Sequence, residues 1–209
     1  MSAKWNSTLK KTRNALRILL VAATACFGSL SWADPIRIAT FNASLSRKGP
    51  GLLLRDIQVA KDDQLRNVIA IIQTVRPDIL LLNEFGHDYE NLALIAFLDL
   101  LAQDADGRQG IRYPHFYAPP QNTGVPSGMD LNGDGKLGGP ADAHGFGNFR
   151  GQYAMALVSR FPLDTEAVKD FSAVLWKDIP NADMPKDPDG TPLPTAEAAA
   201  VIRLSSKGH

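Results

Sequence analysis

The stretch Pro77-Asp78-Ile79-Leu80-Leu81-Leu82-Asn83-Glu84-Phe85 decides the expected fold of this 209-residue chain. Four consecutive aliphatic residues, with a proline before them and polar residues after them, are typical of a buried strand in an α/β sheet. Open α/β sheets carry their chemistry at the carboxyl ends of their strands, and this strand delivers a carboxylate there. Glu84 is therefore the first residue that we expect in a functional site.

A strand and a helix are expected before this stretch. Residues 36–42 (IRIATFN) alternate and are rich in strand formers, so they predict a strand that ends at Asn42. Residues 61–75 carry apolar side chains at helical spacing, and Arg76-Pro77 stops that helix. The order predicts a β-α-β unit. If its two strands lie parallel as neighbours, Asn42 and Glu84 reach the same edge of the sheet.

The rest of the chain alternates between expected elements and irregular stretches. A second helix is predicted at about 90–102, and strands are predicted at 152–160 and 199–204. Residues 118–150 are dense in Gly, Pro, Asn and Asp, so we expect an insertion that lies over the domain rather than in its core. A second loop rich in Pro and Asp is expected at 178–195.

Residues 1–33 have the pattern of an export signal. Five basic residues precede an apolar stretch at 18–30, and Ser31-Trp32-Ala33 follows it. We expect cleavage after Ala33, which makes 34–209 a secreted or periplasmic protein. With roughly 13 residues, the apolar stretch is shorter than the ~20 that cross a bilayer, so no stable membrane span is expected after cleavage. A permanent anchor is the alternative interpretation.

The charge balance bears on the kind of partner. The whole chain has 22 basic and 22 acidic residues, but the expected leader contains five of the basic ones and none of the acidic ones. The exported part then has 17 basic residues against 22 acidic ones. Tight nonspecific binding of nucleic acid uses a basic face, so this balance disfavours nucleic acid as a partner without excluding it. A small phosphate ester is compatible with it.

Three segments in this order carry a family resemblance: IRIATFN (36–42), RPDILLLNEF (76–85) and GQYAMALVSRFPL (151–163). Together they resemble the amino-terminal half of the endonuclease/exonuclease/phosphatase superfamily of metal-dependent phosphoesterases. The resemblance implies an α/β fold, the four-layer αββα sandwich with two face-to-face sheets. This sandwich would be incomplete at the C-terminus, because the family's Gly-Asp-x-Asn and Ser-Asp-His patterns do not follow 199–204.

The resemblance also implies roles for two residues. Glu84 matches the family's metal-binding glutamate, and Asn42 matches the asparagine that assists the metal and the phosphate group. Mg²⁺ or Mn²⁺ is the implied cofactor, since such cations take hard oxygen ligands and polarise phosphoryl oxygens. The chain is thus expected to be an exported, Mg²⁺-dependent phosphoesterase (a phosphodiesterase, nuclease or phosphatase) with Asn42 and Glu84 as its catalytic residues. Its phosphate-ester substrate and its oligomeric state are left open, and a fragment without the later motifs is expected to have little or no activity.

The insertion contains a second possible metal site. In Asp130-Leu131-Asn132-Gly133-Asp134-Gly135, oxygen donors alternate and a glycine stands where a calcium loop turns sharply. Asp130, Asn132 and Asp134 therefore resemble the first half of an EF-hand loop that binds structural Ca²⁺. The twelfth position is Ala141 rather than glutamate, although Asp142 follows it. The alternative is an Asx/Gly turn cluster. The alternative function is a noncatalytic fragment or a calcium-stabilised extracellular binding module.

Overall fold

The computed structural model describes residues 34–184, 186, 188–191 and 195–207. The expected export signal at 1–33 lies outside the described residues, and the helices and strands below all belong to the unit that begins at Ile36. In chain order they are β1 (Ile38–Leu45), α2 (Leu52–Val59), α3 (Asp63–Val75), β2 (Ile79–Phe85), α4 (Leu92–Leu101), β3 (His115–Tyr117), β4 (Ala154–Ser159) and α5 (Ala196–Ala199). Single 3-10 turns occur at Tyr89–Asn91, Pro140–Asp142, Thr165–Ala167 and Trp176–Asp178.

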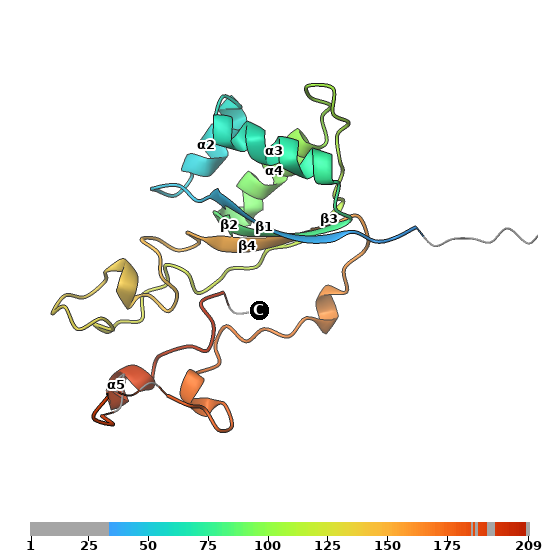
Figure 1. The fold of residues 1–209 in the computed structure, drawn as a ribbon. Coiled ribbons are helices and arrows are strands. Elements are labelled where there is room, and N and C mark those ends of the chain that lie inside the picture. The colour runs from blue at the N-terminus through green and yellow to red at the C-terminus, as the bar shows by residue number, and fades with distance from the viewer. Residues whose placement is uncertain (1–33, 185, 187, 192–194, 208–209) are drawn as a thin grey trace, which may run out of the picture. The chain divides into compact units, whose positions relative to one another are not determined.

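The strands form one four-stranded sheet in the order β1-β2-β4-β3 (Figure 1). Strands β1 and β2 are parallel neighbours, with Ile38 opposite Ile79 and Asn42 opposite Asn83. Strand β4 runs antiparallel to both β2 and β3. Helices α2 and α3 connect the parallel pair, so the expected β-α-β unit and the α/β class are confirmed.

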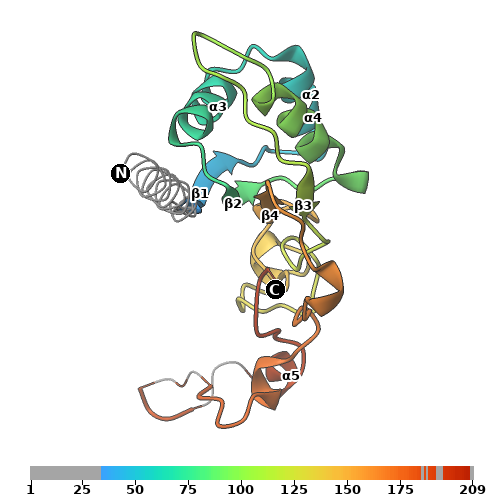
Figure 2. The same cartoon turned by 90° about the vertical axis from the view of Figure 1, so that its right-hand side faces the viewer.

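The helices α2, α3 and α4 cover one face of this sheet (Figures 1 and 2). Helix α3 begins where the Asp62 carboxylate accepts a hydrogen bond from the backbone N–H of Leu65, and it ends at Arg76 in a left-handed conformation before Pro77. Its buried residues meet the alternate residues of the strands that face the helices. The resulting core includes Leu45, Leu53, Ile57, Leu65, Val68, Ile72, Leu80, Leu82, Phe85, Leu94, Phe97, Leu101, Ala156 and Val158.

Irregular segments and the short helix α5 lie on the other side of the sheet (Figures 1 and 2). We call the sheet face that α2, α3 and α4 do not cover the helix-free face. The buried side chain of Asn122 holds two of the irregular segments together. Its Nδ2 atom donates to the carbonyl oxygens of Ser172 and Ser205, each at 2.8 Å, and its Oδ1 atom accepts from Arg203 at 2.5 Å. Within the described ranges this face carries loops rather than a second sheet, so the four layers of the expected sandwich are not confirmed.

One local expectation is wrong, and two elements were not expected. The strand expected at 199–204 is wrong: residues 196–199 form helix α5, and an isolated bridge pairs Leu175 with Arg203. The reason is local, because the alanine-rich stretch favours a helix and the Thr195 hydroxyl caps it by accepting from Ala198. Helix α2, with eight residues, and strand β3, with three, were not expected, because each is short.

Candidate active site

A β-bulge at the end of β2 sets the direction of Glu84. Leu80 and Leu82 are buried against the helices, so strict alternation would place Glu84 on their side of the sheet. The pairing register breaks instead: Asn83 pairs with Met155, Phe85 pairs with Ala154, and Glu84 is the extra residue. Its φ of 54° is in the left-handed region, which is rare for a residue other than glycine. Phe85 takes the next buried position, and Glu84 is left partly exposed beside Asn83 on the helix-free face.

Asn42 lies on the same face of the neighbouring strand. The adjacent residues Phe41 and Ala43 pack toward the core, whereas Asn42 is exposed. Its Cα partner across the parallel pair is Asn83, the residue before Glu84. The Oδ1 atom of Asn42 accepts a hydrogen bond from the backbone N–H of Ser44 at 3.0 Å, which fixes the amide. The structure therefore brings Asn42 and Glu84 to one face, one residue apart in register.

The Ser46 hydroxyl ties the bulge to the segment that enters β4. Ser46 Oγ donates to the carbonyl oxygen of Glu84 at 3.2 Å and accepts from the backbone N–H of Tyr153 at 3.0 Å. Tyr153 also has a positive φ, of 58°. Strained conformations of this kind persist only where surrounding contacts hold them, and they cluster at functional sites. The serine bridge is one such contact.

A lysine that sequence analysis did not select approaches this region. Lys207 Nζ donates to the carbonyl oxygen of Tyr153. Burial lowers the pKa of Lys207, and the nearby Glu84 carboxylate partly opposes that shift. The two residues are far apart in sequence and Lys207 follows Ser-Ser without any periodic pattern, so no sequence signal connects it with Glu84.

Glu84 is the carboxylate of the candidate site, and the amides beside it are the other oxygen donors that we consider. Within the described part of the chain, no three His, Cys, Asp or Glu side chains gather in a way that could hold a metal ion. The available oxygen donors are the Glu84 carboxylate and the amide oxygens of Asn42 and Asn83, whose Nδ2 atom donates to Thr40 at 2.9 Å. Mg²⁺ keeps several waters and often takes only one or two protein carboxylates plus substrate phosphate oxygens. This donor set fits a sparsely ligated Mg²⁺ or Mn²⁺ ion.

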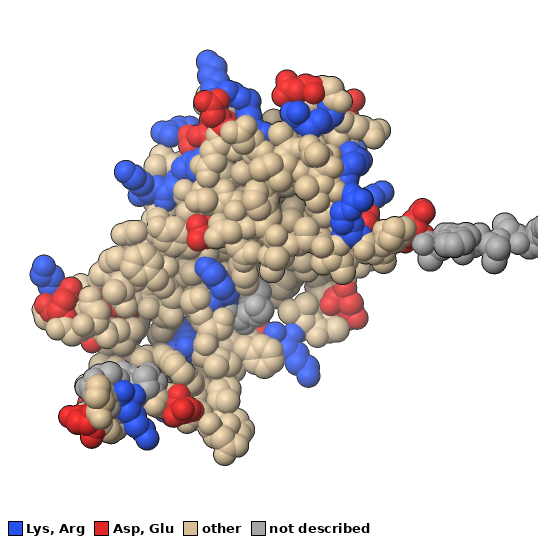
Figure 3. Space-filling view, in the orientation of Figure 1, with Lys and Arg blue, Asp and Glu red and all other residues tan. Residues whose placement is uncertain are grey.

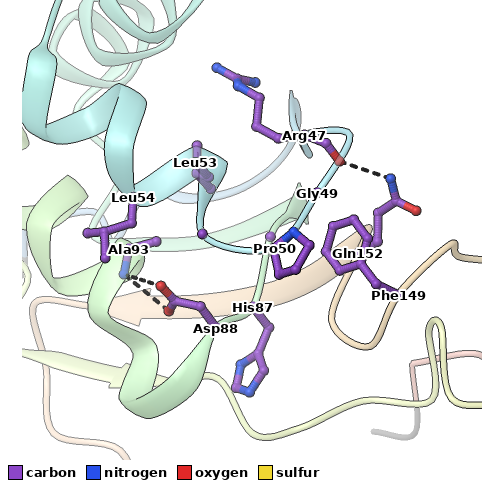
Figure 4. A pocket seen from close by; sticks show the side chains of 12 residues that line it. Arg47, Gly49, Pro50, Leu53, Leu54, His87, Asp88, Ala93, Phe149 and Gln152 are labelled. Atoms are coloured by element: carbon purple, nitrogen blue, oxygen red, sulfur yellow. Dashed lines mark hydrogen bonds between the residues drawn. The ribbon is translucent and has the colours of Figure 1, made fainter.

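A small cavity lies beside the end of β2, between Pro50, Phe149 and Gly86-His87 (Figure 4). Its volume of about 20 Å³ has room for a water molecule but not for a phosphate ester. The His87 ring points away from Pro50, and burial lowers the pKa of His87. The Arg47 guanidinium is bound to Asp56 at 2.8 Å. Glu84, which is partly exposed, does not line this cavity.

The loop with Asp130, Asn132 and Asp134 is closed by its own hydrogen bonds. The Asp130 carboxylate accepts from the backbone N–H groups of Gly133, Asp134 and Gly135, at 2.7, 3.2 and 2.8 Å. The buried Asp142 carboxylate accepts from the N–H of Leu131 at 2.9 Å, so it closes the loop from the other end. Asx turns of this kind are compatible with an Asx/Gly turn cluster and with a calcium loop.

Comparison with known proteins adds a finding to this geometry. A sequence model of the Endonuclease/Exonuclease/phosphatase family matches residues 39–204, a range that contains Asn42 and Glu84. No curated protein and no solved structure matches the chain. In the part of the chain that the structure describes, no helix is both long enough and apolar enough to span a membrane.

Proposed function

Because the chain belongs to the endonuclease/exonuclease/phosphatase family, we propose that its helix-free face hydrolyses phosphate esters with a divalent cation held at Glu84. The observation that carries the proposal is the bulge, which turns Glu84 onto the face that carries Asn42. The positive φ of Glu84 at the bulge costs stability, and such strain is typical of functional sites. We infer that the bulge serves to place the Glu84 carboxylate beside the Asn42 amide at the end of the parallel strands.

The residues divide the chemistry between them. Glu84 supplies the anionic oxygen that holds Mg²⁺ or Mn²⁺, and Asn42 supplies a neutral oxygen donor or an N–H group for the phosphate. A cation bound there would withdraw charge from the phosphoryl oxygens and the leaving oxygen. Asn42 adds no negative charge, so it does not repel the phosphate. Its hydrogen bond with Ser44 keeps the amide in one orientation before the substrate arrives.

The substrate that we propose is a phosphate ester met outside the cytoplasm. The signal-like residues 1–33 support export, and the acidic balance of the remaining chain supports a small ester over a long nucleic acid. Figure 3 agrees, because on the face it shows Lys and Arg are scattered among Asp and Glu rather than joined in a basic stripe. Nucleic acid is the second substrate class for the same chemistry.

The alternative is a binding module without turnover. It is favoured by the lack of a larger ligand group, because no three His, Cys, Asp or Glu side chains within the described residues are placed to hold a metal ion. Such a module would bind the cation and the phosphate group but would lack a group to activate water. The loop at Asp130 would then stabilise the module with calcium.

Hydrolysis of bis(p-nitrophenyl) phosphate by the expressed chain tests the proposal. We expect slow turnover that requires Mg²⁺ or Mn²⁺ and that falls at least about 100-fold in Glu84→Gln, since even outer-sphere changes at metal sites cost 10–100-fold. Glu166→Gln is the matched control, because Glu166 is exposed on the 3-10 turn Thr165–Ala167. Metal-dependent turnover that survives in Glu84→Gln would refute the assigned role. Cation binding without turnover would establish the binding module.

A further inference from the structure

Two aromatic side chains pack against each other where the insertion meets the start of β4. The rings of Phe146 and Tyr153 stack, with their centroids 6.3 Å apart and an angle of 30° between their planes. Phe146 belongs to the insertion and is 59% exposed, whereas Tyr153 is partly buried. A stacked pair at this spacing is favourable, so each ring restrains the other. We call these two side chains the aromatic platform.

Close contacts hold the backbone on both sides of Phe146. Its neighbours Gly145 and Gly147 are buried. An added Cβ atom would lie 2.7 Å from the carbonyl oxygen of Ser206 at the first position and 2.9 Å from the backbone nitrogen of Gly124 at the second. The N–H of Gly124 also donates to the carbonyl oxygen of Gly145 at 2.8 Å. The exposed ring of Phe146 is therefore presented from a fixed backbone, and a ligand that binds it orders little of the chain.

Tyr153 connects the aromatic platform with the bulge at Glu84. The Ser46 Oγ atom lies 3.0 Å from the backbone nitrogen of Tyr153 and 3.2 Å from the carbonyl oxygen of Glu84. In addition, Ala154, which follows Tyr153, pairs with Phe85. Two independent backbone contacts thus place Tyr153 at the end of β2 and β4 where the bulge lies.

The aromatic platform combines features that a lone exposed phenylalanine lacks. Single apolar residues are common on protein surfaces, so the exposure of Phe146 alone indicates nothing. Here the exposed ring is backed by a second ring, its backbone is fixed, and the pair adjoins the candidate site. Aromatic side chains bind planar rings of ligands by stacking, whatever substituents those rings carry. The platform is therefore preorganised for a planar ring.

We propose that the aromatic platform binds a small phosphate ester whose alcohol part carries an aromatic ring, and that this ring stacks on Phe146. The inference rests on the proposed function and names the substrate class of that site. Stacking would remove apolar surface of both rings from water. Aryl phosphates and mononucleotides share the required chemistry, because a nucleobase stacks on an aromatic side chain in the same way.

Isothermal titration calorimetry in the presence of Mg²⁺ tests the inference without requiring turnover. It compares phenyl phosphate and adenosine monophosphate with glycerol phosphate, which has no ring, and we expect a ring-bearing ester to bind more tightly. Phe146→Leu keeps an apolar side chain and removes the ring, so the affinity for that ester should fall about fivefold or more. Binding of glycerol phosphate should not change. Phe161→Leu is the matched control, because Phe161 is 42% exposed and follows the other end of β4.

The outcomes separate this inference from the proposed function. Phe146→Trp keeps a stacking ring and should retain the preference for the ring-bearing ester, and the ester that loses more affinity in Phe146→Leu identifies the source of the ring. A wild-type chain that binds none of the esters, or binds all three equally, would overturn the inference. So would a preference that survives in Phe146→Leu or is lost equally in Phe161→Leu. The proposed function fails on a different result, namely Mn²⁺ binding that is unaffected in Glu84→Gln.

Discussion

Asn42 and Glu84 lie on the same face of the sheet because a bulge interrupts β2 between Asn83 and Phe85. Without the extra residue, the alternation that buries Leu80 and Leu82 would bury Glu84 as well. A carboxylate in that core would have to lose its charge or find a partner. The bulge therefore turns the Glu84 side chain from the core to the helix-free face, and bulges that redirect a side chain are common beside active sites.

The serine bridge should control the geometry of this bulge. We expect Ser46→Ala to lower the free energy of unfolding by about 1 kcal/mol, the usual contribution of a hydrogen bond. It should also weaken Mn²⁺ binding, because the Glu84 backbone loses a contact that holds it. Chemical denaturation and a Mn²⁺ titration measure the two effects. In the control Ser127→Ala, whose hydroxyl bonds to the backbone of Met129 in the insertion, Mn²⁺ affinity should not change.

Gly151 should tolerate no side chain. Its φ is +87°, and an added Cβ atom would lie 2.4 Å from the carbonyl oxygen of His87, a backbone atom that cannot move aside cheaply. We expect Gly151→Ala to destabilise the fold by about 3 kcal/mol or more, since the steric clash adds to the strain of the positive φ. Gly128→Ala has the same kind of strain in open space and should cost only about 1 kcal/mol. Equal losses in a denaturation series would show that the close approach to His87 is absent.

Asp78 should make the fold sensitive to acid. The backbone N–H of Arg37, at 2.8 Å, and the guanidinium of Arg160, at 2.6 Å, hold the pKa of Asp78 below its ordinary value. A carboxyl group with a lowered folded-state pKa adds stability above its unfolded pKa, and that stability is lost as the pH falls through the folded value. The contacts join the ends of β1, β2 and β4, so their loss should weaken the sheet below about pH 4.

The Asp78→Asn variant tests this pH dependence. The difference in stability between the wild-type chain and Asp78→Asn should be largest near neutral pH and should shrink as the pH falls through the acidic range. Thermal denaturation at a series of pH values measures it. Asp99→Asn is the control, since Asp99 is exposed on α4. A constant difference for Asp78→Asn would contradict the assignment.

Calcium should protect the insertion if the loop at Asp130 is a cation site. Limited proteolysis of residues 118–150 is expected to slow in saturating Ca²⁺, and Asp130→Ala should abolish that protection. Mg²⁺ at the same concentration is the control ion, because it prefers a smaller, octahedral shell. Unchanged cleavage in Ca²⁺ would leave the Asx/Gly turn cluster as the correct interpretation, in line with the backbone N–H groups that already occupy the Asp130 carboxylate.

The parallel pair and its connecting helix were predictable because their patterns are strong and local. The alternation in 36–42, the helical spacing in 61–75 and the aliphatic run before Glu84 each imply one structure, and the proline after Arg76 marks the boundary. The face on which Glu84 lies was not predictable. It depends on a bulge that the strand sequence does not reveal, because the register is settled by pairing with β1 and β4.

The remaining differences come from contacts between distant parts of the chain. Residues 199–204 have a strand-like composition, but Ala199 ends helix α5 and Arg203 donates to Asn122, which lies far away in sequence. Lys207 likewise donates to the carbonyl oxygen of Tyr153, more than fifty residues earlier. Insertions such as 118–150 look like solvent-exposed loops in composition, yet Asn122, Thr123 and Asp142 are buried within this one. Tertiary contacts of this kind override local propensity.

A double-mutant cycle on Mn²⁺ binding, followed by electron paramagnetic resonance, tests the central claim that Asn42 and Glu84 form one cation site. We predict that Glu84→Gln removes most of the affinity, that Asn42→Ala weakens it about tenfold, and that the double variant is no weaker than Glu84→Gln alone, since coupled residues are not additive. Independent effects that add, or Mn²⁺ binding that neither substitution changes, would contradict the account.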